Sequence, residues 1–201
     1  MQFHELAVPG VVAFTPEVFT DGRGQFVAPF QQSLFAKATG HPLQLGQCNQ
    51  SVSRRGVIRG VHFTDVPPGQ AKYVYCARGA LLDVAIDVRV GSPTFGRWCS
   101  VLLDAKTARA VYLAEGIGHA FAALTDGTVM AYLCSTGYDP AAERAVHPLD
   151  PALHLPWPPD ITPILSDKDR AAPTLGEAAA AGILPPWGAC QARYAELRAA
   201  H

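Results

Sequence analysis

The chain has 201 residues, 49% of them hydrophobic, and its 16 Lys plus Arg and 17 Asp plus Glu leave a formal net charge of -1. A chain of this length can form a globular domain whose core needs no disulfide or metal, and the composition is not that of a disordered protein. The near-zero charge excludes the broad positive field that non-specific nucleic-acid binding requires. We therefore expect a single domain over residues 1–201 and no nucleic-acid partner.

Short strands are the elements expected up to residue 134. The clearest pattern lies at residues 82–88, where Leu, Val, Ile and Val alternate with Asp, Ala and Asp in a period of two. Further strands are expected at residues 74–76, 98–103, 110–113, 121–124 and 128–134. The 18 Gly and 17 Pro residues supply turns between such runs. Short strands separated by turns at roughly 8–12-residue spacing favour an all-β sandwich or barrel.

Helical patterns are short and lie outside this region. A helix is expected at residues 33–39 before Gly40, a second after a capping box from Thr174 to Glu177, and a third at residues 191–200. Six prolines within residues 147–163 exclude a central strand, because each lacks a backbone N–H. We expect barrel strands over residues 10–147 and a wrapping segment over residues 148–201.

The cysteines and the N-terminus indicate a compartment. The five cysteines form no C-x-x-C pair and are odd in number, which predicts reduced, buried thiols. The first 14 residues lack the basic start and long apolar core of a signal peptide, and no apolar stretch approaches the roughly 20 residues of a membrane span. We expect a cytoplasmic protein without a membrane partner.

One histidine lies in the densest cluster of polar and glycine residues. His62 shares a period-two pattern with Ile58 and Gly60, which predicts that all three face one side of a strand. In a small barrel that side can be a ligand-filled interior, where an imidazole can act as a general base near neutral pH. The pattern fits equally a histidine that is hydrogen-bonded in the core, and spacing alone leaves both interpretations open.

Other polar residues sit next to apolar strands. Lys72 opens such a strand, and its burial is costly unless it meets an anion, although a surface position is also consistent. His119 lies between a turn and a strand. Tyr132 alternates with Met130 and Cys134, and a buried tyrosine needs a partner for its hydroxyl.

No metal site is expected. Metal-binding barrels often carry a His-x-His element, but His62 is followed by Phe63 and Thr64, and no other close His, Cys or Glu cluster appears. The nucleophile-elbow, phosphate-loop and dinucleotide-binding motifs are also absent.

Several ordered motifs together resemble the dTDP-4-dehydrorhamnose 3,5-epimerase family over residues 10–175. The motifs are Asp21-Gly-Arg23-Gly-Gln-Phe26, Gln47-Cys-Asn49-Gln-Ser51, Gly56-Val-Ile-Arg59-Gly60-Val-His62, Gln70-Ala-Lys72, residues 91–96, Gly118-His119-Ala-Phe121, Tyr132, Tyr138-Asp-Pro140, Glu143 and Ser166-Asp-Lys168-Asp169. Residues 71–76, 91–98 and 110–112 look especially like the actinobacterial branch, which serves antibiotic deoxysugar pathways. The resemblance implies an all-β, cupin-type jelly roll that is cofactor-free, metal-free and homodimeric, with N-terminal residues crossing to the partner.

The resemblance also implies an isomerase and assigns the catalytic residues. Its substrate is a dTDP-linked 4-keto-6-deoxy sugar, whose C4 carbonyl acidifies the C3 and C5 protons. By similarity His62 is the base, Asp169 orients its ring, and Lys72 stabilises the negative charge that develops on the C4 oxygen. Tyr132 is the acid on the opposite face. Epimerisation at C5, C3 or both remains open.

Nine further residues are implied to bind substrate. Arg23, Arg59 and Lys168 match diphosphate contacts, His119 the sugar pocket, Phe26 (from the partner) and Tyr138 the nucleoside, and Gln47, Asn49 and Glu143 polar positions. Arginine suits a diphosphate because it donates two parallel hydrogen bonds. Ala28 stands where many rhamnose-pathway members carry a glutamate.

Two alternatives compete with the epimerase. A metal-free cupin could hold a nucleotide-sugar without turnover, but binding alone needs no opposed acid and base. A metal-dependent cupin oxygenase or isomerase is disfavoured by the missing His-x-His element.

Overall fold

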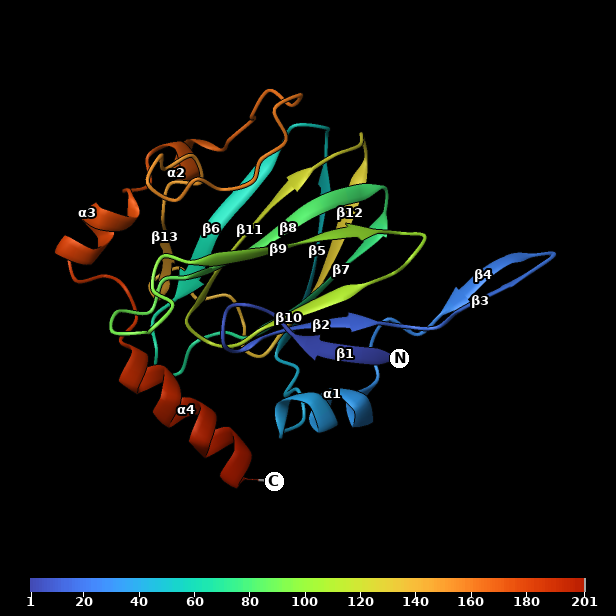
Figure 1. The fold of residues 1–201 in the computed structure, drawn as a ribbon, viewed down its shortest axis with the longest axis horizontal. Helices are drawn as coiled ribbons and strands as arrows, with labels where there is room; N and C mark the ends of the chain where they lie inside the picture. The colour runs from blue at the N-terminus through green and yellow to red at the C-terminus, as the bar shows by residue number, and fades with distance from the viewer. Residues whose placement is uncertain (201) are drawn as a thin grey trace.

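The computed structural model describes residues 1–200 as thirteen strands and four short helices (Figure 1). The strands are β1 (Gln2–Glu5), β2 (Val11–Thr15), β3 (Val18–Asp21), β4 (Gly24–Val27), β5 (Gln47–Ser53), β6 (Ile58–Thr64), β7 (Lys72–Arg78), β8 (Ala80–Asp87), β9 (Trp98–Asp104), β10 (Ala110–Leu113), β11 (Ile117–Ala123), β12 (Thr128–Cys134) and β13 (Glu143–Ala145). The helices are α1 (Gln32–Thr39), α2 (Asp167–Arg170), α3 (Leu175–Ala180) and α4 (Trp187–Ala199).

Two antiparallel sheets pack face to face. The first has six strands in the order β1-β2-β10-β7-β12-β5, and the second has five in the order β13-β6-β11-β8-β9. Apolar side chains of both sheets meet between them, including Val74 and Met130 from the first and Leu81, Ala85 and Phe121 from the second. The non-consecutive order within each sheet brings distant segments of the chain side by side, which is how one interior collects residues from the whole sequence.

Strand β8 confirms the period-two pattern, and both of its faces are buried. Its apolar residues Val84 and Ile86 pack on the outer face of the sheet, against the C-terminal part of the chain. Its two aspartates, Asp83 and Asp87, are also buried, at 1% and 0% exposure. The polar face of this strand therefore points into the protein, where each aspartate has a charged or polar partner.

The two largest differences from the expected boundaries are the starts of β11 and α4. β11 starts at Ile117 instead of residue 121, because Gly118 fits under Val61 where a Cβ atom would come within 2.7 Å of a valine methyl. α4 starts at Trp187, four residues before the expected start, since Pro186 has an extended backbone and can precede a helix without losing a needed N–H. The helix expected at residues 33–39 is confirmed as α1, which starts one residue earlier, and the capping box from Thr174 to Glu177 is confirmed.

The proline-rich segment contains no strand at residues 147–163, as expected. It runs over the outer face of the five-stranded sheet, where Leu153 joins Leu175 and Leu184 in an apolar cluster with that sheet. The indole N–H of Trp98 on β9 donates to the Leu153 carbonyl at 3.0 Å. This path carries the chain from β13 to α2.

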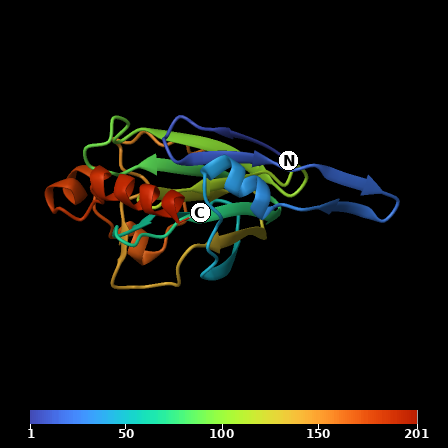
Figure 2. The ribbon, with the colours of Figure 1, turned by 90° about the horizontal axis from the view of Figure 1, so that it is seen from below.

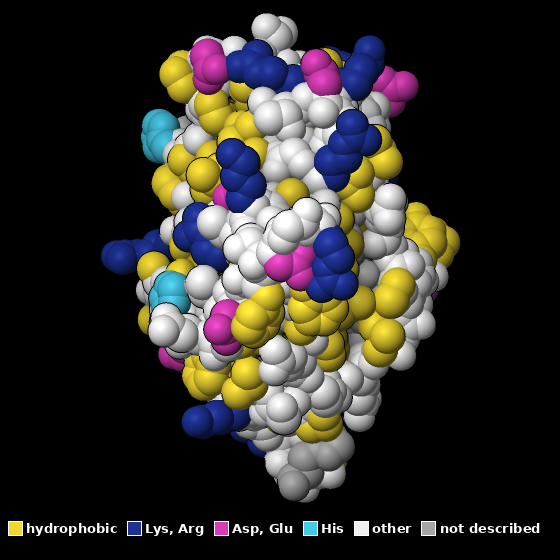
Figure 3. All heavy atoms as spheres, turned by 90° about the vertical axis from the view of Figure 1, so that its right-hand side faces the viewer, with side chains coloured by type: hydrophobic (Ala, Val, Ile, Leu, Met, Phe, Trp, Pro, Cys, Tyr) yellow, Lys and Arg dark blue, Asp and Glu magenta, His cyan; other side chains and the backbone are white. Residues whose placement is uncertain are grey.

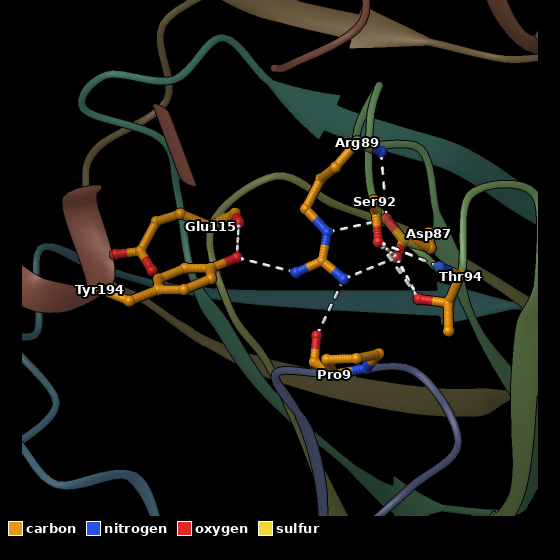
Figure 4. A network of polar contacts seen from close by, with 7 residues as sticks. All are labelled: Pro9, Asp87, Arg89, Ser92, Thr94, Glu115 and Tyr194. Carbon is orange, nitrogen blue, oxygen red and sulfur yellow. Dashed lines mark hydrogen bonds and ion pairs between the residues drawn. The ribbon is translucent and has the colours of Figure 1, made fainter. Parts of the chain in front are cut away.

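Helix α4 is held to the barrel by a buried ion pair (Figure 4). The Arg89 guanidinium donates to both carboxylate oxygens of Asp87 at 2.7 and 2.8 Å, to the Pro9 carbonyl at 2.9 Å and to the Tyr194 hydroxyl of α4 at 3.1 Å. Arg89 also lies over the ring of Trp187, 4.4 Å from its centre. Both α4 and α1 thus lie at one end of the barrel (Figures 1 and 2).

Strands β3 and β4 form a hairpin that projects away from both sheets (Figures 1 and 2). Phe26 on β4 is 70% exposed, and Phe19 opposite it is 54% exposed. A two-stranded hairpin that leaves its aromatic residues in solvent gains little from its own contacts. We call residues 18–27 the arm.

All five cysteines are free. The prediction that they are buried is wrong for Cys48, which is exposed on the edge strand β5, and Cys99 is only half-buried. Of the four helices within residues 1–200, none has the length and hydropathy that a membrane crossing requires.

Candidate active site

A pocket of about 460 Å³ opens between the two sheets. Its walls come from β5, β7 and β12 of the six-stranded sheet, from β6 of the five-stranded sheet, and from the segments around residues 138–143 and 164–169. Nine of the thirteen predicted site residues line it: Asn49, Arg59, His62, Lys72, Tyr132, Tyr138, Glu143, Lys168 and Asp169. The fold therefore brings together residues that lie up to 120 positions apart in the sequence.

His62 and Asp169 form a hydrogen-bonded pair on one wall. The Nε2 atom of His62 lies 2.6 Å from Oδ1 of Asp169, which is buried at the start of α2. Burial by itself raises the pKa of the Asp169 carboxyl, but hydrogen bonds, chiefly from the His62 ring, outweigh it and hold this pKa below its usual range. The carboxylate is thus ionised and accepts the Nε2 proton, which leaves Nδ1 of His62 as the basic nitrogen.

Asp169 owes its position to a helix cap. The Ser166 hydroxyl accepts the backbone N–H of Asp169 at 3.1 Å and fixes the first turn of α2. Upstream, the Gly56 carbonyl accepts the backbone N–H of Ile164 at 2.9 Å, which ties this segment to the start of β6. The wrapping segment is therefore tied to the start of β6 just before the capped turn that carries the Asp169 carboxylate.

A bulge in β6 turns two functional side chains toward the pocket. His62 pairs with His119 of β11, and Arg59 pairs with Phe121. The two β6 residues are three positions apart but their β11 partners only two, so β6 contains one extra residue. A side chain at position 60 would lie 2.4 Å from the His119 carbonyl oxygen, and Gly60 has a φ of +120°, which glycine adopts readily. The expectation that residues 58, 60 and 62 share one face is wrong at Ile58, whose side chain packs with Ala122 and Ile161, because the bulge breaks the alternation between Ile58 and His62.

Lys72 and Tyr132 lie on the opposite wall, on the neighbouring strands β7 and β12. Burial lowers the pKa of the Lys72 ammonium, and this ammonium forms no ion pair with any residue that the structure describes. Burial raises the pKa of Tyr132 to about 12, so its phenol is protonated at neutral pH. One wall thus carries a base, and the other carries a proton donor and an unpaired cation.

Strand β5 presents a row of polar side chains that begins with the motif at residues 47–51 and continues to Ser53. On alternate positions, Gln47 contacts Asn49 and Asn49 contacts the Cys134 thiol. Ser51 contacts the Tyr132 hydroxyl, and Ser53 contacts the Arg59 guanidinium. The period-two spacing of these polar residues is the sequence signal for Ser51, which lines the pocket, and for Ser53, which is buried and holds the Arg59 side chain.

His119 stands behind the pocket wall rather than among the residues that line it. It is 4% exposed, its Nε2 atom lies 2.6 Å from Oδ1 of Asp83, and its ring packs edge-on against Tyr132 at 6.2 Å between centres. Asp83 was not predicted as a site residue. An aspartate within an apolar alternating run is nevertheless a sequence signal of a buried carboxylate that needs a partner. A direct contact of His119 with the sugar stays a prediction.

The pocket rim is built around Tyr138. Gln47 accepts the Tyr138 backbone N–H at 2.8 Å, and Gln70 donates to the Thr136 carbonyl at 3.0 Å, so the loop is held from β5 and from the loop before β7. The ring itself is 60% exposed. The charged residues Glu143 and Lys168 face each other across the rim at 3.9 Å.

Arg23 and Phe26 do not reach the pocket of their own chain. Both lie on the arm, where Arg23 is paired with Asp21 and its side chain is 91% exposed. Their predicted contacts with the nucleotide therefore need the arm of a second chain and stay predictions. Within residues 1–200 no group of three or more His, Cys, Asp or Glu side chains is placed to hold a metal ion.

A pocket with an ordered base, a facing phenol and an unpaired ammonium can move a proton onto and off a carbon next to a carbonyl. On a two-sheet all-β scaffold, this defines a proton-transfer site. The comparisons with known proteins specify the class further.

The family model of dTDP-4-dehydrorhamnose 3,5-epimerase matches residues 5–177. A dTDP-4-dehydrorhamnose 3-epimerase of Streptomyces niveus is 54% identical over 96% of this chain and 92% of its own length. A dTDP-4-dehydrorhamnose 3,5-epimerase of Mycolicibacterium smegmatis is 51% identical over 98% of both chains. A crystal structure of a 3'-monoepimerase from Streptomyces bikiniensis in complex with dTDP-quinovose superposes with a TM-score of 0.95 at 49% identity, covering 97% of this chain and 98% of that one.

The chain belongs to the dTDP-4-dehydrorhamnose 3,5-epimerase family. The resemblance stated from the motifs is confirmed, and so are the isomerase class and the cupin-type jelly roll. The family favours an epimerase over a cupin that binds a nucleotide-sugar without turnover.

Proposed function

We propose that this chain epimerises a dTDP-linked 4-keto-6-deoxyhexose at a carbon next to the C4 ketone, with His62 as base and Tyr132 as acid. The observation that carries the proposal is the placement of these two groups on opposite walls of one pocket. Removal of a proton by His62 leaves an enolate, and protonation from the other wall returns the hydrogen to the opposite face, which inverts the carbon.

Lys72 stabilises the enolate in this proposal. Its ammonium is partly buried and unpaired in the described chain, which is costly unless an anion arrives. The C4 oxygen becomes negative only as the proton leaves, so the attraction is strongest where it lowers the barrier.

Arg59 and Lys168 hold the diphosphate. The Arg59 side chain is tied to β5 through Ser53 at 3.2 Å and the Val52 carbonyl at 3.4 Å, and neither partner neutralises its charge. A guanidinium that is fixed but not neutralised suits a diphosphate. Asn49, Glu143 and Tyr138 line the same pocket, with Gln47 behind Asn49, and complete the polar contacts.

Deuterium exchange tests the reaction. In D₂O the enzyme is expected to place deuterium at C3, C5 or both of dTDP-4-keto-6-deoxyglucose and to form the inverted sugar, because the abstracted proton equilibrates with solvent at His62. NMR of the product identifies the carbon that is attacked. An absence of exchange with this sugar and with its deoxy and amino relatives would overturn the epimerase proposal.

The arm supplies residues to the pocket of a second copy in the same proposal. It carries Arg23 and Phe26 away from its own pocket, and Phe19 and Phe26 lie exposed on it. Figure 3 looks onto the end from which the arm projects, where hydrophobic side chains are scattered among Lys and Arg. An arm of this composition is stable when it packs on another chain, which supports a symmetric dimer of a cytoplasmic enzyme.

Mixing two inactive variants tests the arm. His62→Ala keeps the arm but loses the base, and the double variant Arg23→Ala/Phe26→Ala keeps the base but loses the arm contacts. After joint refolding, activity at low substrate is expected to recover to about a quarter of the wild-type value, since half of the dimers are mixed and each has one complete site. Refolding the arm variant alone is the control, and no recovery in the mixture would contradict the exchange of arms.

A further inference from the structure

We propose that Ser51 is a positioning residue for the acid step, stabilising the Tyr132 phenolate as the phenol gives up its proton. This inference rests on the proposed epimerase function and adds to it a residue that controls whether the enolate is inverted or returned. Ser51 lines the pocket but has no role in the base wall, so its effect can be separated from that of His62.

The geometry places one hydroxyl against another. Oγ of Ser51 lies 3.3 Å from the Tyr132 hydroxyl, and it is the one hydrogen-bond partner of that hydroxyl within the described chain. The register of the two strands pairs Asn49 with Tyr132, and Ser51 with Met130, so Ser51 reaches the hydroxyl end of the ring diagonally from the next position on β5.

The surroundings of Tyr132 determine how much the Ser51 hydrogen bond stabilises the phenolate. Burial disfavours a phenolate here, Asp83 and Cys134 oppose its charge, and Arg59 and the Ser51 hydrogen bond favour it. The His119 ring on β11 packs edge-on against Tyr132, with Asp83 on β8 behind it. Arg59 is committed to Ser53 and to the diphosphate, which leaves the Ser51 hydroxyl as the neutral group that can turn toward the new charge.

The acid step balances as follows. A C–H bond forms at the enolate carbon with the proton of the Tyr132 hydroxyl, the electron pair of the O–H bond stays on oxygen, and the phenolate accepts a hydrogen bond from Ser51. Before the step the same pair can be oriented with either oxygen as donor. A hydrogen bond to a charged group is stronger than one between neutral groups, so Ser51 stabilises the state after proton transfer more than the state before it.

The enolate has two fates, and Ser51 affects only one. His62 can return a solvent-derived proton to the original face, which gives exchange without inversion, or Tyr132 can protonate the other face. Loss of the Ser51 hydroxyl slows the second route and leaves the first unchanged. The ratio of exchanged, uninverted sugar to inverted sugar therefore measures the contribution of Ser51.

The experiment compares Ser51→Ala with Ser51→Thr in D₂O, following deuterium in the starting sugar and appearance of the epimer by NMR. Ser51→Ala is expected to slow inversion about 10- to 100-fold, the range for a hydrogen bond to a charged group, while deuterium still enters uninverted substrate. Ser51→Thr keeps a hydroxyl and is expected to restore inversion. Ser100→Ala, at an exposed position of β9, is the matched control and is expected to match the wild type.

Three outcomes separate this inference from the parent proposal. Equal losses of exchange and inversion in Ser51→Ala would indicate general damage to the site and overturn the inference. Inversion at the wild-type rate in Ser51→Ala would overturn it as well. If the wild-type protein itself exchanges no hydrogen with any of the sugars tested, the proposed function fails first, and Ser51 is not the cause.

Discussion

Replacing His62 with Ala is expected to abolish both hydrogen exchange and epimer formation, lowering kcat/KM by at least about 10³-fold. A positioned general base contributes about 10²–10⁴, and the other candidate bases lie outside this wall: His119 is buried behind the pocket against Asp83. Exchange and inversion fall together because both begin with the same abstraction. The measurement is deuterium incorporation and epimer formation followed in one NMR sample.

His4→Ala is the matched control for that variant. His4 is exposed on β1, far from the pocket-lining strands, and its loss is expected to leave both rates unchanged. Survival of exchange at one carbon in His62→Ala would contradict the assignment of a single base. Addition of imidazole to that variant is expected to restore part of the exchange, since the cavity left by the side chain opens to the pocket.

Asp169→Asn tests why the base is ordered. The amide cannot stabilise an imidazolium, so exchange is expected to fall less than in His62→Ala but by more than tenfold.

The lowered pKa of the Asp169 carboxyl also has a consequence for stability. A carboxyl whose pKa is lower in the folded than in the unfolded state stabilises the fold at every pH above its ordinary pKa. This stabilisation is lost as the pH falls below about 4. Asp169→Asn is expected to reduce that acid sensitivity of unfolding.

Arg89→Met is expected to lower the free energy of unfolding by about 3–5 kcal/mol, the range for breaking a buried ion pair. Both side chains are fully buried, so after the guanidinium is removed Asp87 keeps only neutral donors, which are the Ser92 and Thr94 hydroxyls and the backbone N–H of residue 89 (Figure 4). The same change loosens α4, because Tyr194 and Trp187 lose their contacts with the guanidinium and keep only their backbone-carbonyl partners Glu115 and Val90 as hydrogen-bond partners on the barrel. Urea unfolding monitored by circular dichroism measures the loss.

The surface pair on the arm is the matched control for the buried one. Arg23→Met removes a guanidinium that is 91% exposed, and water screens an exposed pair so that it contributes little to stability, so the unfolding midpoint is expected to stay nearly unchanged. The double variant Asp87→Leu/Arg89→Met is expected to recover part of the loss, since no buried charge remains. A loss in Arg89→Met as small as that in Arg23→Met would show that the network does not anchor α4.

Local patterns in the sequence determined much of the scaffold. The alternation at residues 82–88 is strand β8, and the capping box at Thr174 is the start of α3, because each depends on neighbours a few residues away. The same holds for the helix before Gly40, whose C-cap has a left-handed backbone with φ +83°. The ordered motifs also named His62, Lys72, Tyr132 and Asp169, all of which line one pocket.

The tertiary structure alone decided how those residues meet. Asp169 comes to His62 across 107 residues through a proline-rich segment that has no periodicity, and the β6 bulge that aims Arg59 and His62 at one pocket depends on the pairing with β11. Long-range pairing is set by which sheet faces fit together, and local sequence carries little of that information. The proposed roles of Ser51 and of the arm could not be derived from periodicity for the same reason: each depends on a neighbour outside its own strand, which periodicity within one strand does not specify.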